Sequence, residues 1–374
     1  MKIYKMILFL AILFSFTSCN KEEILQEEEI VEEPKEETAV ETKEYIIYEG
    51  EFELPVNGAT GFTTLESEIF KEASTESESL GNIPGGRPFE ILKETEDYWK
   101  IRYESQEGFI KNTYCLINLP DVVPSIAYDG IKTYASKDRS LGKEIPGVTG
   151  ELIYPGTDYN ERFDQERFII PILYPTAKKI RKIQQEALKN GETLIVYEGY
   201  RPLSAQEVMV RGLMDLAAKD PEVNKAISTP PWSIDWFAGS GVSNHQYGYA
   251  VDLSLAIVKD SRVAYTGDYQ YTEVTIRSDL PMPTAVNELS TRSIVFTAPV
   301  DPASPDVWKT AKLAPTMNDN AIRLQNYCTQ HGLTPLASEW WHFNDIEEEN
   351  KMINTSFSGE YVYKSLRSKP AMKQ

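Results

Sequence analysis

Short alternating segments dominate residues 46–119. Hydrophobic and polar residues alternate in three of them, namely 88–93, 98–103 and 108–111. Alternation with a period of two predicts strands, and in the second segment it places Trp99, Ile101 and Tyr103 on one face. Because these strands are short, closely spaced and without helical periodicity between them, they predict a small antiparallel barrel.

A different pattern follows a turn-prone junction at 119–124, where helical and strand-like periods alternate. Apolar residues recur at helical spacing over 175–190, and a glycine follows as the expected stop signal. The apolar run 193–197 is bounded by polar residues and suits a buried strand. Ser204 with a glutamate three residues later predicts a capping box, which opens a helix that runs to Lys219.

The composition is that of a globular protein with a strong negative charge. The chain has 374 residues, 41% hydrophobic and 25% charged, which excludes a fibrous or wholly disordered protein and allows two folded domains. There are 38 basic and 57 acidic residues, so the formal net charge is −19. This charge would repel phosphate backbones and anionic lipids, and we do not expect nucleic acid as a partner.

The N-terminus has the form of an export signal. Residues 1–5 include two lysines and no acidic residue, the apolar run 6–16 is too short to span a bilayer comfortably, and small residues precede Cys19. This resembles a bacterial lipoprotein signal, in which 1–18 form the signal peptide and Cys19 is lipidated. The alternative is an ordinary cleaved secretion signal in which the cysteine is incidental. Both interpretations predict export.

Residues 19–45 form an acidic tail that we expect to be a disordered linker. Eleven glutamates face three lysines between residues 20 and 45, and such a segment buries too little apolar surface to offset its ordering entropy. Acidic residues after the cysteine also resemble surface-export signals of some Gram-negative lipoproteins. We therefore expect a cell-envelope lipoprotein of the outer membrane, periplasmic or surface-exposed, which the lipid alone attaches to the membrane.

The first candidate chemical motif runs from Ser243 through His245 and Gly248 to Asp252. Alternation from residue 249 onward places Ala250 and Asp252 on one face, and His245 can fold back over Asp252 because a glycine intervenes. An imidazole and a carboxylate brought together in this way are ligands that zinc accepts. A hydrogen-bonded pair in a protein core is the alternative interpretation.

The second motif is Glu339-Trp340-Trp341-His342. A spacing of three on an extended segment puts the carboxylate and the imidazole on opposite faces unless a turn or bulge intervenes, so we expect irregular backbone at the tryptophans. His342 would complete two histidines and one aspartate with a position left for water, as in catalytic zinc sites. Glu339 would be the general base. An aromatic core strand is the alternative.

The third motif is Glu198-Gly199-Tyr200-Arg201-Pro202, directly after the predicted buried strand. Polar residues at a strand end lie where substrate groups can reach them. Arg201 keeps its charge and offers a rigid fork of donors, which can hold a carboxylate or a developing oxyanion. By itself the motif is also compatible with an ordinary strand-to-helix turn.

Together the three motifs resemble the zinc D,D-peptidase family, which includes the D-alanyl-D-alanine dipeptidases of vancomycin resistance and related D,D-carboxypeptidases. Members carry Tyr-Arg-Pro, Ser-x-His-x-x-Gly-x-Ala-x-Asp and Glu-x-Trp-His in this order, and this chain matches their spacing over residues 126–348. The resemblance implies an α+β zinc peptidase domain over 125–374, with helices packed on an antiparallel sheet. It also implies one Zn²⁺ per chain as cofactor.

The resemblance assigns roles to individual residues. Its metal ligands fall on His245, Asp252 and His342, its catalytic base on Glu339 and its transition-state arginine on Arg201. The residues that we expect near the substrate are Ser243, Glu198, Tyr200 and Trp341. The chain departs from the family at Glu198, where an aspartate is usual, and in a longer region before Glu339.

The resemblance also predicts the reaction. A zinc-activated water, with Glu339 as base, would hydrolyse the D-Ala-D-Ala dipeptide or the D-Ala end of peptidoglycan stem peptides. The two departures leave open which of these substrates is used. The alternatives are a peptidase for another wall peptide bond and a lipoprotein that only binds peptidoglycan.

The strands of residues 46–119 also carry a resemblance. A Gly-Gly turn, a strand, an acidic turn, Trp-Lys-Ile-Arg and then Glu-Gly-Phe-Ile-Lys resemble bacterial SH3-like domains of cell-wall proteins. Those domains often bind peptidoglycan peptides. A spacer or a wall of the catalytic cleft is an equally good interpretation of this region.

The remaining histidine and cysteines are expected to be structural. His331 ends a helical stretch that begins at about Asn320, where an imidazole can interact with the last carbonyls. Cys115 and Cys328 fall in different predicted domains, so we expect free or buried thiols, although export would permit a disulfide.

Overall fold

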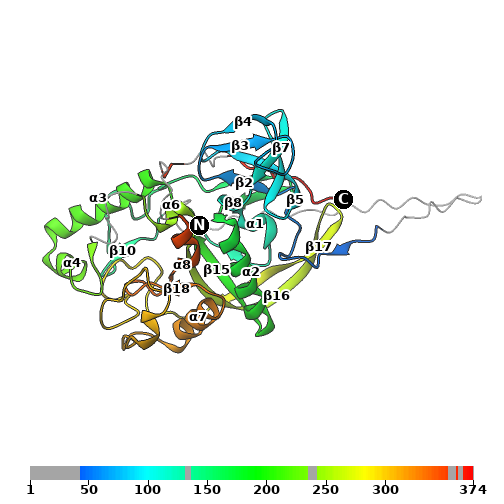
Figure 1. Cartoon of the computed structure of the whole chain (residues 1–374). Coiled ribbons are helices and arrows are strands. Elements are labelled where there is room, and N and C mark those ends of the chain that lie inside the picture. Colours follow the sequence, from blue (N-terminus) through cyan, green and yellow to red (C-terminus); the bar gives the residue numbers. More distant parts are fainter. Residues whose placement is uncertain (1–42, 131–135, 235–241, 353–358, 361–364, 374) are drawn as a thin grey trace, which may run out of the picture. The chain divides into compact units, whose positions relative to one another are not determined.

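A computed structural model describes residues 43–130, 136–234, 242–352, 359–360 and 365–373. The predicted signal peptide, Cys19 and nearly all of the acidic tail lie outside the described residues. By its contacts the chain divides into residues 1–43 and 44–374, and all helices and strands of the described residues belong to the second unit (Figure 1). In the described ranges, no helix is both long and apolar enough to span a bilayer.

The N-terminal region is all-β, and the predicted antiparallel pairing of its strands is confirmed. Its strand order is β14-β8-β2-β5-β6-β7-β3-β4. The bounds are β2 Thr60–Thr63, β3 Ser67–Phe70, β4 Ser79–Ile83, β5 Pro88–Thr95, β6 Tyr98–Tyr103, β7 Gln106–Lys111, β8 Cys115–Asn118 and β14 Pro171–Leu173. The three predicted strands are β5, β6 and β7. Trp99 and Ile101 are fully buried, and Tyr103 is partly buried on the same side.

A second sheet forms the core of the C-terminal region. Its main path is β1-β17-β16-β15-β9, and β19 joins β16 to β18. The bounds are β1 Ile46–Ile47, β9 Ala127–Tyr128, β15 Glu192–Glu198, β16 Ala250–Thr266, β17 Tyr269–Asp279, β18 Thr334–Pro335 and β19 His342–Asn344. The central pairs are antiparallel, whereas the short edge strands β1 and β9 pair in parallel. The predicted buried strand is β15.

Helices pack on this sheet, so the expected mixed α and β architecture is confirmed. Their bounds are α1 Leu119–Val122, α2 Tyr174–Lys189, α3 Leu203–Lys219, α4 Pro221–Ala226, α6 Asn244–Tyr247, η1 Val307–Thr310, α7 Asp319–Gln330 and α8 Ile346–Met352. Short hairpins pair β10 Arg139–Ser140 with β11 Lys143–Glu144 and β12 Thr157–Asn160 with β13 Gln165–Phe168. Helix α2 buries its apolar stripe against β15, and Gly191 follows it at φ +72°.

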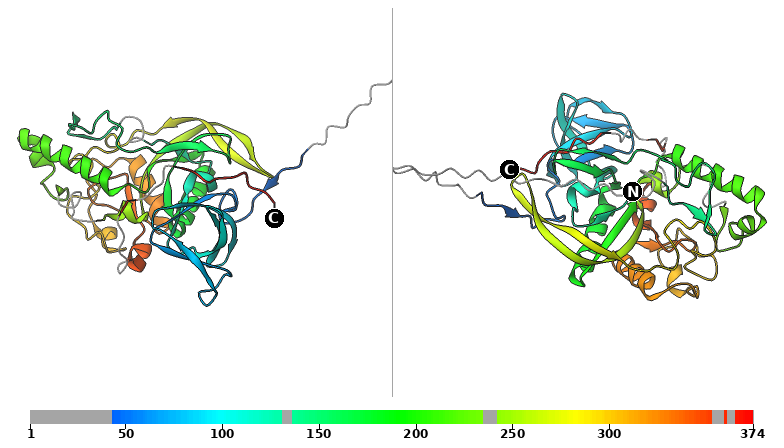
Figure 2. Two further views of the ribbon diagram at one scale, coloured as in Figure 1. Left: turned by 90° about the horizontal axis from the view of Figure 1, so that it is seen from above. Right: turned by 180° about the vertical axis from the view of Figure 1, so that it is seen from behind.

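The β16–β17 hairpin is the longest pair of strands and reaches the C-terminal residues (Figure 2). The backbone amide of Asp268, in its turn, donates to the carbonyl of Ala371 at 2.8 Å. The predicted capping site of α7 is also confirmed in position, because His331 is its C-cap residue. Cys115 and Cys328 are free and buried, as expected.

The start of α3 differs from the prediction. The helix begins at Leu203 with Pro202 at the N-cap and no side-chain cap, so Ser204 lies inside the first turn and forms no capping box. The carboxylate of Glu360 instead accepts hydrogen bonds from the backbone amide and the hydroxyl of Ser204. A distant acidic side chain therefore satisfies the helix start, where the helix dipole favours a negative charge.

The segment interpreted as a junction, 119–124, is buried and connects the two sheets. Its first four residues form α1, and β8 directly before it pairs with β14 from the C-terminal region. The carboxylate of Asp121 in α1 accepts hydrogen bonds from the Thr60 amide at 2.9 Å and the Ser368 hydroxyl at 2.7 Å. The SH3-like region thus shares one continuous hydrophobic core with the region that follows it.

Candidate metal and peptidase site

The turn between α6 and β16 brings His245 over Asp252. Gly248, the C-cap residue of helix α6, has φ +79°, and a β-carbon at that glycine would lie 2.4 Å from Leu116. A residue other than glycine is disfavoured there by both conformation and space. The chain can therefore reverse directly into β16, and the ring of His245 faces the third residue of that strand.

Strand pairing supplies the third member of the group. Asp252 of β16 and His342 of β19 lie directly opposite each other in the antiparallel register. Side chains of directly opposed residues share one face of a sheet and lie close together. His342 and Asp252 are therefore neighbours because of the ladder, and His245 completes a buried trio from three separate segments.

The backbone at the two tryptophans is irregular, as predicted. Trp340 and Trp341 form a turn before β19 begins, and the His342 amide donates to the Glu339 carbonyl at 3.3 Å. This turn overcomes the unfavourable spacing of three, because Glu339 and His342 both line the same cavity of about 300 Å³. The indole groups are buried in the core.

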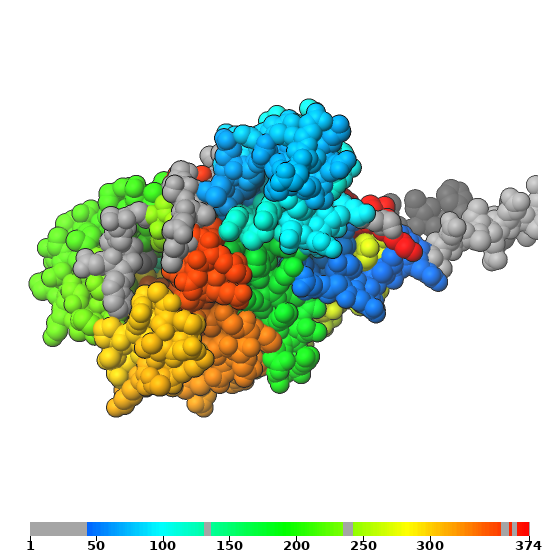
Figure 3. All heavy atoms as spheres, in the orientation of Figure 1, coloured from blue at the N-terminus to red at the C-terminus, as the bar shows by residue number. Residues whose placement is uncertain are grey.

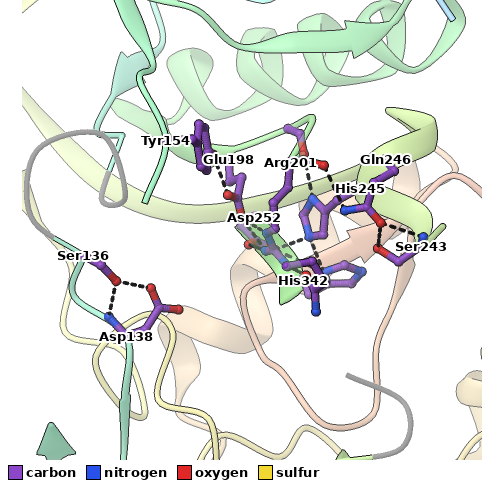
Figure 4. Close-up of polar contacts among 12 residues, drawn as sticks. Ser136, Asp138, Tyr154, Glu198, Arg201, Ser243, His245, Gln246, Asp252 and His342 are labelled. Atoms are coloured by element: carbon purple, nitrogen blue, oxygen red, sulfur yellow. Dashed lines mark hydrogen bonds and ion pairs between the residues drawn. The ribbon is translucent and has the colours of Figure 1, made fainter. Parts of the chain in front are cut away.

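The three inner atoms have the spacing of metal ligands (Figure 4). His245 Nε2 lies 3.2 Å from His342 Nδ1 and 3.5 Å from Asp252 Oδ1, and His342 Nδ1 lies 3.1 Å from the same oxygen. Ligands on a tetrahedron about 2.0–2.1 Å from zinc are roughly 3.3 Å apart. The spacing of these nitrogens and oxygen therefore fits a single ion of that size.

The outer nitrogen of each ring is held by an oxygen. His245 Nδ1 donates to the Gly199 carbonyl at 2.7 Å, and His342 Nε2 donates to Asn344 Oδ1 at 3.0 Å. In the neutral rings this leaves the lone pairs on the two nitrogens that face Asp252, as metal-binding histidines require. The Asn244 amide donates to the same Asn344 oxygen at 2.9 Å and fixes its direction.

The electrostatics of the trio keep a negative oxygen available. Burial would raise the pKa of Asp252, but the two facing imidazoles outweigh it and hold the pKa well below its ordinary value. Burial and Arg201 lower the pKa of His245. Burial also acts to lower the pKa of His342, but Asp252, Glu339 and Asn344 outweigh it, so the pKa is raised above its ordinary value. A bound cation would take the place of the proton that Asp252 favours on the His342 ring.

Arg201 lies beside the trio and is fixed by several acceptors. Its Nε donates to Glu198 at 2.7 Å, Nη1 donates to Gln206 at 2.5 Å and Nη2 lies 3.5 Å from Asp252 Oδ2. Burial would lower the pKa of Arg201, but the neighbouring carboxylates raise it above its ordinary value. The guanidinium is therefore a permanently charged, preorganised group on the cavity wall.

Comparison with known families now identifies the region. The D-ala-D-ala dipeptidase family matches residues 146–360, which is more than half of the chain. The chain belongs to this family of peptidases. The bacterial SH3 domain family matches residues 68–115. No curated protein matches the chain.

The dipeptidase-family match contains every residue of the predicted site, but the structure divides them into two groups. Those that line the cavity are Arg201, Ser243, His245, Glu339 and His342, with Asp252 behind the two rings. Glu198, Tyr200 and Trp341 are buried and are not among the described lining residues. Glu198 binds Arg201 and accepts from the Tyr154 hydroxyl, so we reassign it as the residue that orients the arginine.

Sequence reasoning missed several polar residues of this dipeptidase-family site. Gln206 follows Arg201 in the first turn of α3, and Asn344 shares a strand face with His342, so both had a positional signal. Glu349 of α8 also lines the cavity, although it is one of three consecutive glutamates without any distinctive spacing. Ser243 is the N-cap of α6, and its hydroxyl donates to Gln246 at 2.6 Å.

Proposed function

We propose that this chain is an exported zinc metallopeptidase that hydrolyses D-Ala-D-Ala, as the free dipeptide or as the end of a peptidoglycan stem peptide. The observation that carries the proposal is the convergence of His245 Nε2, Asp252 Oδ1 and His342 Nδ1 beside a cavity that the two histidines line. Membership of a peptidase family supports the reaction class. The SH3 match supports a substrate from the cell wall.

The three inner ligand atoms would hold the ion, and the residues around them would carry out the proton transfers. Zinc bound there would polarise the scissile carbonyl and lower the pKa of a water molecule to about 7. Glu339, on the same cavity wall, would accept the proton from the attacking water and deliver it to the leaving amine. Arg201 would stabilise the negative charge that develops on the carbonyl oxygen.

The size of the cavity favours a small substrate or the end of a larger one. Its volume of about 300 Å³ is at the lower limit of ligand pockets, which suits two alanine residues. Its lining combines polar side chains with the apolar Trp232, Pro302, Ala303 and Leu336, which suits the charged ends and the methyl groups of D-Ala-D-Ala. A longer stem peptide would have to extend out of the cavity toward the solvent.

We also propose attachment to the outer membrane through a lipid on Cys19, with the acidic segment as a spacer. The support is the sequence alone: a short apolar run, small residues before the cysteine and the glutamates that follow. The lipid would then be the sole membrane contact, and the substrate would be wall material outside the cytoplasm.

Hydrolysis assays on soluble, zinc-loaded residues 44–374 would test the function, with Glu339→Ala as the blank. Alanine release from D-Ala-D-Ala alone would indicate a dipeptidase, and cleavage of a stem pentapeptide would indicate a carboxypeptidase. If wild-type protein cleaved neither peptide, the proposed function would be wrong.

A peptidoglycan-binding lipoprotein is the second candidate, and the SH3 match favours it. Its test is retention of the Glu339→Ala protein on purified, insoluble peptidoglycan. Retention without any peptide cleavage by wild-type protein would support the binding role alone. The whole of residues 44–374 is needed here, because β14 completes the sheet of the SH3-like region and an isolated 46–119 fragment would lack it.

A further inference from the structure

Glu349 is a cavity-lining carboxylate for which the described residues provide neither a side-chain hydrogen bond nor an ion pair. It projects from α8 and lines the same cavity as Arg201, Glu339 and His342. Its Oε2 atom is inaccessible to solvent, and no hydrogen-bond partner for it exists among the residues that the structure describes. A buried polar atom without a partner costs free energy, so such atoms are rare in folded proteins.

Its neighbours on the same helix are neutralised. Glu347 is paired with Lys179 at 3.0 Å, and Glu348 is paired with Lys351 at 2.6 Å. Within the described part of the chain, Glu349 takes part in no ion pair. The missing counter-ion is therefore specific to the one glutamate of the three that faces the cavity.

The surroundings make the lack of a cation more costly. The segment that carries Asp301 lies next to α8 (Figure 3), and Pro302 and Ala303 line the cavity beside Glu349. Burial and the negative charge of Asp301 outweigh the opposing effect of His342 and raise the pKa of Glu349 above its ordinary value. A positively charged group in the cavity would counteract both effects, because an opposite charge nearby favours the ionised carboxylate.

We propose that the Glu349 carboxylate receives an ammonium group of the substrate. The inference rests on the proposed function and adds a specificity-determining residue to it. An ammonium offers the carboxylate up to three N–H donors and a positive charge. A neutral amide group offers no charge. The catalytic groups on the same wall would hold the scissile carbonyl, so the ammonium lies on another part of the bound peptide.

Two sources could supply this ammonium. One is the free α-amino group of the D-Ala-D-Ala dipeptide. The other is the side-chain amine of a diamino acid that precedes D-Ala-D-Ala in a stem peptide. Both place a single positive charge on the N-terminal side of the scissile bond, and peptide pairs that differ only by acetylation distinguish them.

Calorimetric binding to zinc-loaded protein in a Glu339→Ala background tests the inference without turnover. The first pair is D-Ala-D-Ala and N-acetyl-D-Ala-D-Ala. The second pair is Nα-acetyl-L-Lys-D-Ala-D-Ala and its Nε-acetylated form. Glu349→Gln should weaken the amine-bearing member of one pair roughly 10–100-fold and change its acetylated counterpart less than about twofold. The pair that responds identifies the source of the ammonium.

The controls separate this inference from the proposed function. Glu347→Gln is the matched variant, because Glu347 lies on the same helix but is exposed and paired with lysine. Equal losses for both members of each pair, or no loss for either amine, would overturn the role of Glu349. Absence of turnover by protein with intact Glu339 would instead overturn the peptidase function, while the binding data would still decide the role of Glu349.

Discussion

His245 Nε2 and His342 Nδ1 face each other at 3.2 Å, while the outer nitrogen of each ring is bonded to an oxygen. With Asp252 Oδ1 beside them, two imidazoles and a carboxylate converge in the protein interior. Neutral rings would direct two lone pairs at each other, which is favourable when a cation lies between them. The tertiary structure thus holds these side chains in a ligand-competent arrangement.

Zinc should stabilise the folded protein through this group. A thousandfold excess of free zinc over Kd adds about 4 kcal/mol to the free energy of unfolding, so Tm should rise by several degrees. His245→Ala should abolish the rise, and elemental analysis should find one zinc per wild-type chain. An equal rise in Tm for His245→Ala would place the metal elsewhere.

Asn344→Ala should weaken zinc binding although Asn344 is no ligand in this arrangement. The amide oxygen orients His342 by accepting from its Nε2, and loss of such a partner typically costs 10–100-fold in metal affinity. Asn344→Asp keeps an acceptor and should retain most of the affinity. Zinc Kd values from competition with a chelator would check this, and wild-type affinity in Asn344→Ala would mean that packing alone orients the ring.

Arg201→Ala should lower kcat by ~10²–10³ and also lower Tm. The second effect arises because Glu198 and Asp252 are buried and would lose their cationic neighbour. Arg201→Lys keeps the charge, so it should fold better than the alanine variant yet lack the planar fork that the oxyanion requires. Near-wild-type kcat for Arg201→Lys would show that the charge alone is sufficient.

Arg162→Met should destabilise both regions of the protein together, by about 2–4 kcal/mol. The buried guanidinium donates to the carbonyls of Pro55 at 2.7 Å and Asn57 at 2.9 Å, so a residue of the C-terminal region supports the start of the SH3-like region. Urea unfolding should show one transition. Arg139→Met, at an exposed ion pair, is the control, and two separate transitions would contradict the shared core.

The parts of the site that sequence could predict depend on short-range geometry. The glycine before β16 and the two-residue period of that strand predict that His245 lies over Asp252. The turn at the two tryptophans is predicted because Glu339 and His342 can reach the same site only if the backbone is irregular between them. Long-range pairings carry no such local signal. The cap of α3 comes from Glu360, and one of the two strands that pair with β8 is β14, more than 50 residues away along the chain.

The cavity lining is the part of the site that sequence predicts least, because it depends on which otherwise ordinary side chains meet there. Glu349 has the same sequence neighbourhood as Glu347 and Glu348, and only the packing of α8 distinguishes it. Glu198 shows the reverse. Its position in a motif suggested contact with substrate, whereas the fold turns it toward Arg201.

The unpaired state of Glu349 also predicts how stability depends on pH. Burial, followed by the charge of Asp301, outweighs the opposing effect of His342 and raises the folded-state pKa of this carboxyl above its ordinary value of 4.5. Below pH 4.5 the group is protonated in both states, and its contribution to stability is fully present. As pH rises through the folded-state pKa, the folded protein must hold an unpaired carboxylate, and this contribution is lost. Glu349→Gln should therefore raise Tm of the peptide-free protein at pH 7.5 but not at pH 4.

Thermal unfolding of wild type, Glu349→Gln and Glu347→Gln at these two pH values would check the sign. In the wild type, Lys179 and Lys351 lower the pKa of the Glu347 carboxyl. Glu347→Gln removes these ion pairs, so it should leave Tm unchanged or lower it at pH 7.5. A saturating amine-bearing peptide should raise Tm of wild type more than that of Glu349→Gln, because the ammonium would neutralise the carboxylate. A Glu349→Gln protein less stable than wild type at pH 7.5 without peptide would mean that the carboxylate already has a partner in the folded chain.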